Sequence, residues 1–528
     1  MQGPAGLTGA QRDSSMTDQL KVLKYYLYYK YILPRNPFLR DRKALKQWQG
    51  KKLEKHLAYV AGHAPLYRGR RKLSSYPVID KAFMMKHFDR MNTVRISRKE
   101  AEAFALRAER DRDFAPKLRG VTVGLSSGTS GHRGIFLVSD EEKVRWAGYV
   151  LAKFLPGSIL ESMDIAFFMR ADSNLYQAVN SRRIRFHFFD IYRDMEEHIR
   201  RLEALQPRIL VGQPSLLLML GEQVERGALH ISPEVLISIA EVLEGEDETR
   251  LKKVFRQKVI HQVYQCTEGC LASTCPLGTL HLNEDIVHIG RQYLEGRRFV
   301  PIVTDFERKA QPMIRYRLND ILVEREKPCA CGSPFLALEK IEGREDDMFS
   351  FLDEQGREKW IFPDFIRRCV LFAGVKQEKR GEDRPWPAKQ GTETSKAGST
   401  DVRSQMVHGQ EGSQEGVALA AGKWAGSPKG AVAARKGEGS AGGKKTARDR
   451  AEGTWEYRVV QSPNRSITVY AELSPAEEEA VRREFQKLIR DRELVLPEIC
   501  FAPYDWELGK KLKRIQRIQA SETKKRDL

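Results

Sequence analysis

One stretch of this chain has the residue types of an anion-binding loop. Residues 125–134, LSSGTSGHRG, lie between two short apolar runs that are typical of strands. Their Ser, Thr and Gly residues expose hydroxyls and backbone N–H groups with little side-chain bulk, which suits a cradle for phosphate oxygens. The GxxxxGK[ST] spacing of a Walker loop is missing. The stretch therefore predicts a phosphate-binding loop, and a solvated turn is the alternative interpretation.

A strand end further along the chain carries residues that could act on a nucleotide. In YQCTE, residues 264–268, the ring of Tyr264 could stack on a purine, and Thr267 could contact a phosphate or carboxylate oxygen. Glu268 could hold Mg²⁺, which prefers oxygen ligands. Taken alone, such a segment is more often an ordinary strand end.

Three more segments follow in order. In IRYRLND, residues 314–320, Asp320 could accept both hydroxyls of a ribose. In IEGREDDMF, residues 341–349, a hinge between domains could place Arg344 near the ribose or the phosphates. GKKLKRI, residues 509–515, could send one lysine into the same site. A solvated strand edge and a basic tail are the alternatives for the first and the last.

The cysteines indicate a local metal site. The chain has seven, and five of them fall between residues 266 and 331. An odd number in a large chain does not favour a disulfide framework. Three thiolates and one imidazole would form a closed structural zinc site. The candidate ligands are Cys275, His281, Cys329 and Cys331. Cys270 is an alternative ligand, and free buried thiols are the competing interpretation.

Length and charge limit the class of protein. At 528 residues the chain predicts two or three domains. The net charge of +19 is compatible with nucleic acid, a membrane surface or an anionic substrate. No nucleic-acid motif accompanies it, so we expect no nucleic-acid partner. No apolar run approaches the roughly 20 residues of a membrane span. Residues 1–16 lack the apolar core of a signal peptide, which predicts a disordered extension and a cytoplasmic protein.

The elements that must position these segments are mostly predictable. Residues 17 to about 115 have helical spacing, and strand-like and helix-like runs then alternate to about residue 345. This alternation predicts an α/β domain with a mostly parallel sheet. Residues 346–528 predict a small α+β domain, interrupted at 376–453 by a Gly-, Lys-, Ser-, Ala- and Glu-rich insert that we expect to be disordered.

Together, the five segments resemble the core motifs of the adenylate-forming superfamily of acyl- and aryl-CoA ligases. The sequence PMIRYRLND…PCACGSP…IEGREDD is similar to the phenylacetate-CoA ligase branch, which includes an archaeal synthetase that adenylates a deazaflavin coenzyme. The resemblance covers residues 40–375 and 454–518. It implies a large N-terminal adenylate-forming domain, residues 17–345, and a small mobile C-terminal domain. Members of this branch also carry the Cys, His and CxCG residues, which supports zinc.

The resemblance implies a role for each site residue. The phosphates of ATP would be held by Ser126, Ser127, Gly128, Thr129, Ser130 and Gly131, with Arg133 in place of the family's lysine. Tyr264, Ala240 and Glu241 would line the adenine, and Thr267 and Glu268 would bind phosphate and magnesium. Asp320 and Arg344 would bind the ribose. Lys510 would bridge the substrate carboxylate and the α-phosphate, with Lys511 and Lys513 as neighbours that could take its place.

Two departures from the family pattern indicate a divergent subgroup with an unusual substrate. The phosphate loop is one residue shorter, and Leu318-Asn319 replaces the usual Thr-Gly. We therefore predict an ATP- and Mg²⁺-dependent ligase that activates an aromatic or acyl carboxylic acid and passes it to CoA or a carrier-protein thiol. The alternatives are transfer of AMP to a hydroxyl and a non-catalytic basic binding protein. A homodimer is compatible with either enzyme.

Overall fold

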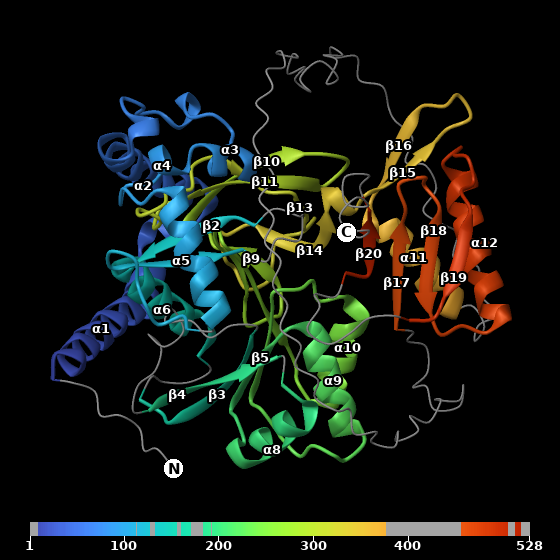
Figure 1. The fold of residues 1–528 in the computed structure, drawn as a ribbon, viewed down its shortest axis with the longest axis horizontal. Helices are drawn as coiled ribbons and strands as arrows, with labels where there is room; N and C mark the ends of the chain where they lie inside the picture. The colour runs from blue at the N-terminus through green and yellow to red at the C-terminus, as the bar shows by residue number, and fades with distance from the viewer. Residues whose placement is uncertain are drawn as a thin grey trace, which may run out of the picture. The chain divides into compact units, whose positions relative to one another are not determined.

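The computed structural model describes residues 9–111, 113–126, 133–155, 160–169, 183–191, 193–375, 456–504 and 513–518 (Figure 1). The side chains of residues 9–17 are not described, and the predicted insert at 376–453 lies outside the described residues. Residues 1–374 and 454–528 form one compact unit. Within the described ranges, no helix combines the length and the apolar character that crossing a bilayer requires.

The N-terminal part is helical, as its spacing predicts. Two aspartates begin helices here by accepting backbone N–H groups: Asp41 accepts from Ala44, and Asp80 accepts from Phe83. The helices are α1 (Gly9–Leu27), α2 (Arg42–His63), α3 (Lys81–Lys86), α4 (Phe88–Met91) and α5 (Arg98–Asp111). A π-helical turn (Tyr28–Ile32) and short 3-10 turns connect them (Leu33–Arg35, Pro37–Leu39, Pro65–Tyr67 and Leu73–Ser75).

A hairpin carries the Ser/Gly loop. Strands β1 (Val121–Leu125) and β2 (Ile135–Ser139) pair antiparallel, and α6 (Asp140–Phe154) follows directly. Helix α6 begins with a capping box, in which Ser139 and Glu142 satisfy each other's backbone N–H groups. Helix α1 packs so closely on α6 that a Cβ at Gly148 would lie 2.5 Å from the Cβ of Tyr25. Glycine is therefore required at that crossing.

The large sheet has a parallel half and an antiparallel half. The parallel strands are β3 (Met163–Met169), β4 (Ile184–Asp190), β5 (Ile209–Gly212), β6 (Val235–Ile239) and β7 (Ile260–Cys266), in the order β4-β3-β5-β6-β7. Helices α8 (Met195–Leu205), α9 (Pro214–Glu225) and α10 (Gly245–Val254) alternate with them. Their apolar side chains form a core with Phe168, Leu210 and Leu236 of the sheet. The predicted α/β class is confirmed, and the parallel pairing lies in this half.

The chain reverses at the hairpin between β7 and β8, and every later pairing in this sheet is antiparallel in the described residues. The later strands are β8 (Gly269–Thr274), β9 (Leu280–Leu282), β10 (Val287–Tyr293), β11 (Arg298–Asp305), β12 (Tyr316–Arg317), β13 (Asp320–Glu324) and β14 (Ala337–Arg344). A short 3-10 turn (Glu345–Asp347) follows β14, the last strand of the large sheet along the chain. The Thr267–Glu268 segment lies at the reversal.

A separate small α+β region follows, as expected from the sequence. It contains the hairpin β15 (Phe349–Leu352) and β16 (Glu358–Ile361), then α11 (Pro363–Val375). A second sheet has the order β19-β18-β17-β20. Its elements are β17 (Tyr457–Gln461), β18 (Ile467–Ala471), α12 (Pro475–Asp491), β19 (Ile499–Ala502) and β20 (Ile515–Arg517). We call this the small region.

Candidate functional site

A cavity of about 1740 Å³ lies where the predicted segments meet. This volume can hold a nucleotide together with a second small molecule. Parts of all five segments line it. The lining includes Ser126, Ala240, Glu241, Tyr264, Thr267, Glu268, Asp320, Arg344 and Lys513. Ser127, Gly128, Thr129, Ser130, Gly131 and Lys510 lie outside the described residues.

Asp320 is the centre of a polar unit on one wall. The Tyr264 hydroxyl donates to Asp320 Oδ2 at 2.5 Å, and Arg344 Nε donates to Asp320 Oδ1 at 3.2 Å. The pairing of β13 with β14 sets Asp320 directly opposite Arg344. Burial and the neighbouring carboxylate hold the pKa of Tyr264 well above its usual value, so the phenol keeps its proton and remains a donor.

Thr267 and Glu268 present oxygen atoms at the end of β7. The Thr267 hydroxyl donates to Glu268 Oε2 at 2.8 Å, and the Glu268 side chain is buried apart from its place on the cavity wall. Tyr316 lies beside Glu268, and burial together with that carboxylate raises the pKa of Tyr316. A carboxylate held in this way is a suitable oxygen ligand for Mg²⁺.

Arg308 connects this turn to the loop-bearing hairpin. Its Nη1 donates to the Thr267 carbonyl at 2.8 Å, and its Nη2 donates to the Leu137 carbonyl of β2 at 3.2 Å. Gln311 supports the same strand by accepting from Leu137 N at 3.0 Å. One guanidinium therefore sets the spacing between two of the predicted phosphate-handling segments.

The base of the Ser/Gly loop is closed by hydrogen bonds between Ser126 and Gly134. Ser126 N donates to Gly134 O at 2.8 Å, and Gly134 N donates to Ser126 Oγ at 2.7 Å. Arg133 Nε donates to the Ser126 carbonyl at 2.9 Å, while its other nitrogens fork onto Glu109 at 2.5 and 2.6 Å. Arg133 thus holds the base of the loop. Its predicted contact with phosphate stays a prediction.

Lys81 is a candidate that sequence reasoning missed. It begins α3 and lines the cavity, and a Cβ on Gly134 would lie 3.1 Å from Lys81 Cε. Burial lowers the pKa of Lys81, and the negative charge of Glu268 opposes that shift. The Lys81 side chain therefore lies beside the loop base and within electrostatic reach of Glu268. Asp80 caps the helix that carries it, but nothing in the sequence pattern marked the lysine as functional.

Ala240 and Glu241 follow β6 at the edge of the sheet where β7 also ends. Ala240 has a φ of +65°, in the left-handed region, which costs a non-glycine residue about 1 kcal/mol. The sharp turn brings Glu241 back over α9, where its Oε2 accepts from Ser215 N at 3.3 Å. Both residues lie on the cavity wall, where they were expected to line the adenine.

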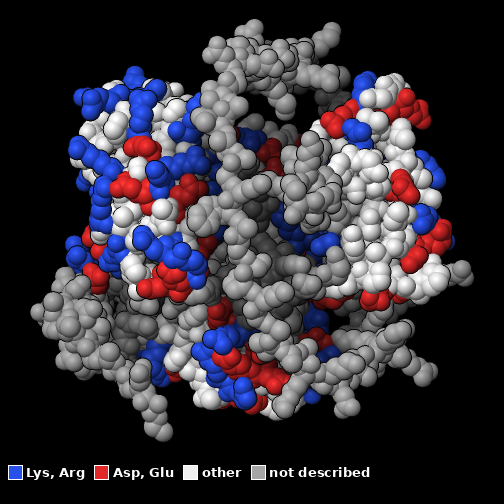
Figure 2. Space-filling model, viewed as in Figure 1, with Lys and Arg blue, Asp and Glu red and all other residues white. Residues whose placement is uncertain are grey.

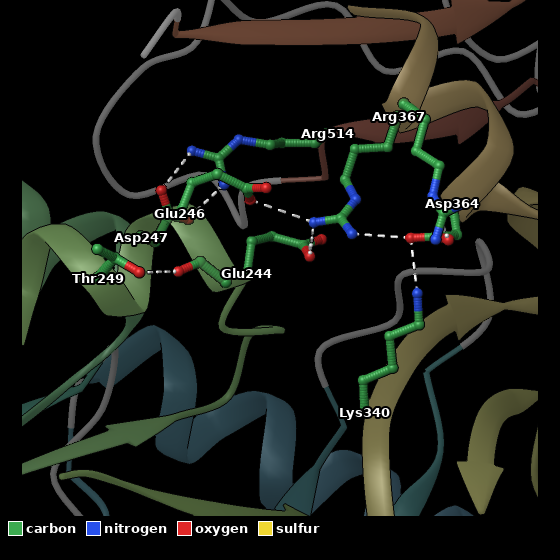
Figure 3. Close-up of polar contacts among 10 residues, drawn as sticks. Glu244, Glu246, Asp247, Thr249, Lys340, Asp364, Arg367 and Arg514 are labelled. Carbon is green, nitrogen blue, oxygen red and sulfur yellow. Dashed lines mark hydrogen bonds and ion pairs between the residues drawn. The ribbon is translucent and has the colours of Figure 1, made fainter. Parts of the chain in front are cut away.

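Two arginines of the small region meet the acidic first turn of α10 (Figure 3). Arg514 forms a forked ion pair with Asp247, and Arg367 Nη1 lies 2.5 Å from Glu244 Oε2. One residue before Arg514, Lys513 Nζ lies 3.1 Å from Asp347 Oδ1 on the cavity wall. Lys513, in the described part of the C-terminal segment, therefore reaches the cavity.

The four predicted zinc ligands come together away from this cavity. Their ligand atoms all lie within 4.8 Å of one another. The Sγ atoms of Cys275 and Cys329 are 3.9 Å apart, close to the spacing of two thiolates on one zinc, and Cys331 Sγ lies 3.4 Å from His281 Nε2. His281 Nδ1–H donates to the Phe335 carbonyl at 3.0 Å, which leaves the Nε2 lone pair facing the thiols.

The alternative ligand Cys270 does not belong to this group. It is buried in the core, and its Sγ accepts a hydrogen bond from Asn283 Nδ2 at 3.4 Å. None of the seven cysteines forms a disulfide, as the odd count led us to expect. The donor set Cys275, His281, Cys329 and Cys331 fits zinc in number, type and spacing.

No family model matches the sequence, and neither does any curated protein. Solved structures do match. One is 2-hydroxyisobutyryl-CoA ligase in the postadenylation state in complex with R3-HIB-AMP, with a TM-score of 0.55 and 14% identity over 94% of this chain and 96% of that chain. The chain has the fold of an adenylate-forming ligase. The same enzyme in complex with 2-HIB-AMP gives a TM-score of 0.52 and 14% identity over 98% of this chain and 92% of that chain.

This likeness concerns the fold, which agrees with the superfamily that the motifs resemble. The closer resemblance to the phenylacetate-CoA ligase branch stays a prediction. The homodimer and the absence of a nucleic-acid partner stay predictions as well.

Proposed function

We propose that this protein is an ATP-dependent ligase that activates a carboxylic acid as an acyl-adenylate and passes the acyl group to a thiol. The observation that carries the proposal is the Tyr264–Asp320–Arg344 unit, which faces the same cavity as Thr267, Glu268 and the base of the Ser/Gly loop. The fold supports it, because its structural neighbour was solved with an acyl-AMP.

The chemistry follows from the charges that must meet. A substrate carboxylate attacks the α-phosphorus of ATP in line, and pyrophosphate leaves. Because both reactants are anions, the site must neutralise negative charge before they can approach. The backbone N–H groups of the loop, Lys81 and the C-terminal lysine supply positive charge. Glu268 with Thr267 would hold Mg²⁺, which would neutralise the phosphates further.

The nucleotide would be fixed by the polar unit at Asp320. Both carboxylate oxygens are oriented by donors, one by Tyr264 and one by Arg344. Each oxygen keeps a lone pair that can accept from a ribose hydroxyl. The adenine would lie against Tyr264, Ala240 and Glu241. The acid, aromatic or acyl, would occupy the remaining part of the cavity.

The second half-reaction needs a thiol to reach the acyl-adenylate. We propose CoA or a carrier-protein thiol as the acceptor, and a swing of residues 346–528 about the Glu345–Asp347 turn, away from residues 17–345. That swing would remove the C-terminal lysine and open the cavity. The Cys275, His281, Cys329 and Cys331 group would bind zinc as a structural clip between the turn before β9 and the turn before β14.

The test is pyrophosphate exchange into ATP, measured against a panel of aromatic and fatty acids. We expect exchange that depends on one class of acid and falls at least about 100-fold in Asp320→Ala, because the ribose loses its acceptor. Tyr264→Phe should lose less, since Arg344 still orients Asp320. Exchange that needs a hydroxylated acceptor and no acid would favour AMP transfer. No ATP binding, with salt-sensitive binding to polyanions, would favour the non-catalytic alternative.

A further inference from the structure

Helix α1 carries two apolar faces. One face is buried against α6 and the core and contains Val22 and Tyr26, followed by Tyr29 in the π-helical turn. At 100° per residue, Leu20, Leu23 and Leu27 fall on the opposite side of the helix. A surface helix of a globular protein ordinarily keeps that side polar.

The second face is open to solvent. The exposed fractions are 63% for Leu20, 37% for Leu23 and 41% for Leu27. Tyr31 at 41% and Ile32 at 61% continue the exposure into the π-helical turn. We call these five side chains the α1 surface. Scattered exposed leucines need no explanation, but a row of them along one helix marks an interaction site.

Positive charge surrounds the α1 surface. Lys21 and Lys24 are exposed among its leucines, and the exposed Arg35 lies just after it, with its guanidinium over the Tyr31 ring at 6.0 Å. Residues 18–35, which include the α1 surface, contain four Lys and Arg against one Asp, a net charge of +3. On the face shown in Figure 2, Lys and Arg also gather at the upper left, over α2, α4 and α5 and apart from α1, with some Asp and Glu among them.

We propose that the α1 surface docks this protein on a membrane surface that contains anionic lipid. An apolar row with lysines among and beside it can enter the boundary between headgroups and acyl chains while its ammonium groups meet lipid phosphates. Neither an aqueous polyanion nor a purely apolar groove would satisfy both features. The helix lies in the plane of the membrane surface and does not cross it.

A second copy of the chain fits less well. A symmetric contact would set the α1 surface against itself and bring Lys21 and Lys24 of both copies close together, where like charges repel. Five side chains along one helix are also far fewer than the 20 to 30 residues a side of a stable interface. The charge therefore favours an anionic bilayer as the occupant.

The experiment is co-sedimentation of the full chain with vesicles of phosphatidylcholine, alone or with about 30% phosphatidylserine. We expect at least about tenfold tighter binding to the anionic vesicles, weakened by salt. Leu20→Glu/Leu27→Glu should abolish binding to both. Lys21→Gln/Lys24→Gln should weaken only the anionic preference, by about fivefold for each lysine. Leu496→Glu, at a comparably exposed leucine of the small region, should bind like the wild type.

Thermal unfolding and ATP binding of each variant show whether it is folded, and neither depends on lipid. Equal binding to neutral and anionic vesicles, or none to either, overturns the proposal. Light scattering without lipid supplies a further outcome. A wild-type dimer that Leu20→Glu/Leu27→Glu converts to a monomer, with no vesicle binding, assigns the surface to a second copy instead. None of these results bears on the ligase chemistry.

Discussion

Arg514 and Asp247 form a forked ion pair between the small region and helix α10, with Nη2 3.1 Å from Oδ1. Only 9% of the Arg514 side chain and 11% of the Asp247 side chain are exposed. Arg514 follows Lys513 directly and Lys510 by four positions. The pair therefore determines where the lysine-bearing segment meets the large sheet, and Arg367 secures the same turn of α10 through Glu244 (Figure 3).

We expect Asp247→Asn to slow formation of the acyl-adenylate by at least about tenfold, because removing one partner of a buried pair leaves the other charge uncompensated. Thioester formation from supplied acyl-adenylate should keep its rate, because the segment is not needed there. Single-turnover assays of each half-reaction measure the difference. Glu248→Gln, on the same helix and ion-paired with the partly exposed Lys252, is the matched control. Equal losses in both half-reactions would contradict this role.

Lys81→Met should raise the KM for ATP by about tenfold, because it removes a cation next to the loop base and Glu268. The methionine keeps the length of the side chain, so α3 should remain folded. Lys86→Met changes an exposed lysine at the other end of α3 and should leave the KM unchanged. Steady-state kinetics on both variants decide the point. A KM effect of the same size in both would remove Lys81 from the site.

Zinc should be present at one ion per chain, and a chelator or Cys331→Ser should remove it. We expect the free energy of unfolding to fall by at least about 2 kcal/mol, because the ion binds the folded chain far better than the unfolded one. Metal analysis and urea unfolding measure the two effects. Cys500→Ser, at an exposed thiol outside the group, should change neither. Full stability without metal would leave these residues as ordinary thiols.

Asp305 should make stability depend on pH. Burial raises the pKa of this carboxyl from 3.8 to about 7, against the opposing charge of Arg308. Between those values the folded chain keeps a proton that the unfolded chain has lost, so stability falls as pH rises through this range and the loss is complete above pH 7. Relative to Asp305→Asn, the wild type should lose a few kcal/mol between about pH 4.5 and 8. The free energies of unfolding of both proteins are measured with urea at each pH. An equal change with pH in the wild type and in Asp305→Asn would contradict this prediction.

The sequence predicted the residues whose type and position both carry information. Each segment alone was weak evidence, but their order along the chain and their resemblance to one set of motifs predicted that Tyr264 and Asp320 would line one cavity. The clustering of cysteines in one part of the chain likewise predicted a local metal site. Lys81 and Asp247 were not foreseeable, since a lysine after a helix cap and an acidic first turn normally face solvent. Their burial arises from partners far along the chain, such as Arg514, which is 267 positions from Asp247.

The α1 surface was not foreseeable from the sequence. Residues 25–33 are mostly aromatic and aliphatic, and an apolar helix normally indicates burial in a core. Only the packing of α1 on α6 shows that one face of the helix is buried and that the other is exposed to solvent.

The two hydrogen bonds of Arg308 limit how this protein can be re-engineered. The two nitrogens of the planar Arg308 guanidinium donate to the carbonyls of Thr267 and Leu137. A lysine at this position could not reproduce both contacts, because it has a single ammonium group. A chimaera that takes its Ser/Gly hairpin from another protein of this fold would need to take the β11–β12 connection from the same protein. The hairpin and the connection therefore form one structural unit.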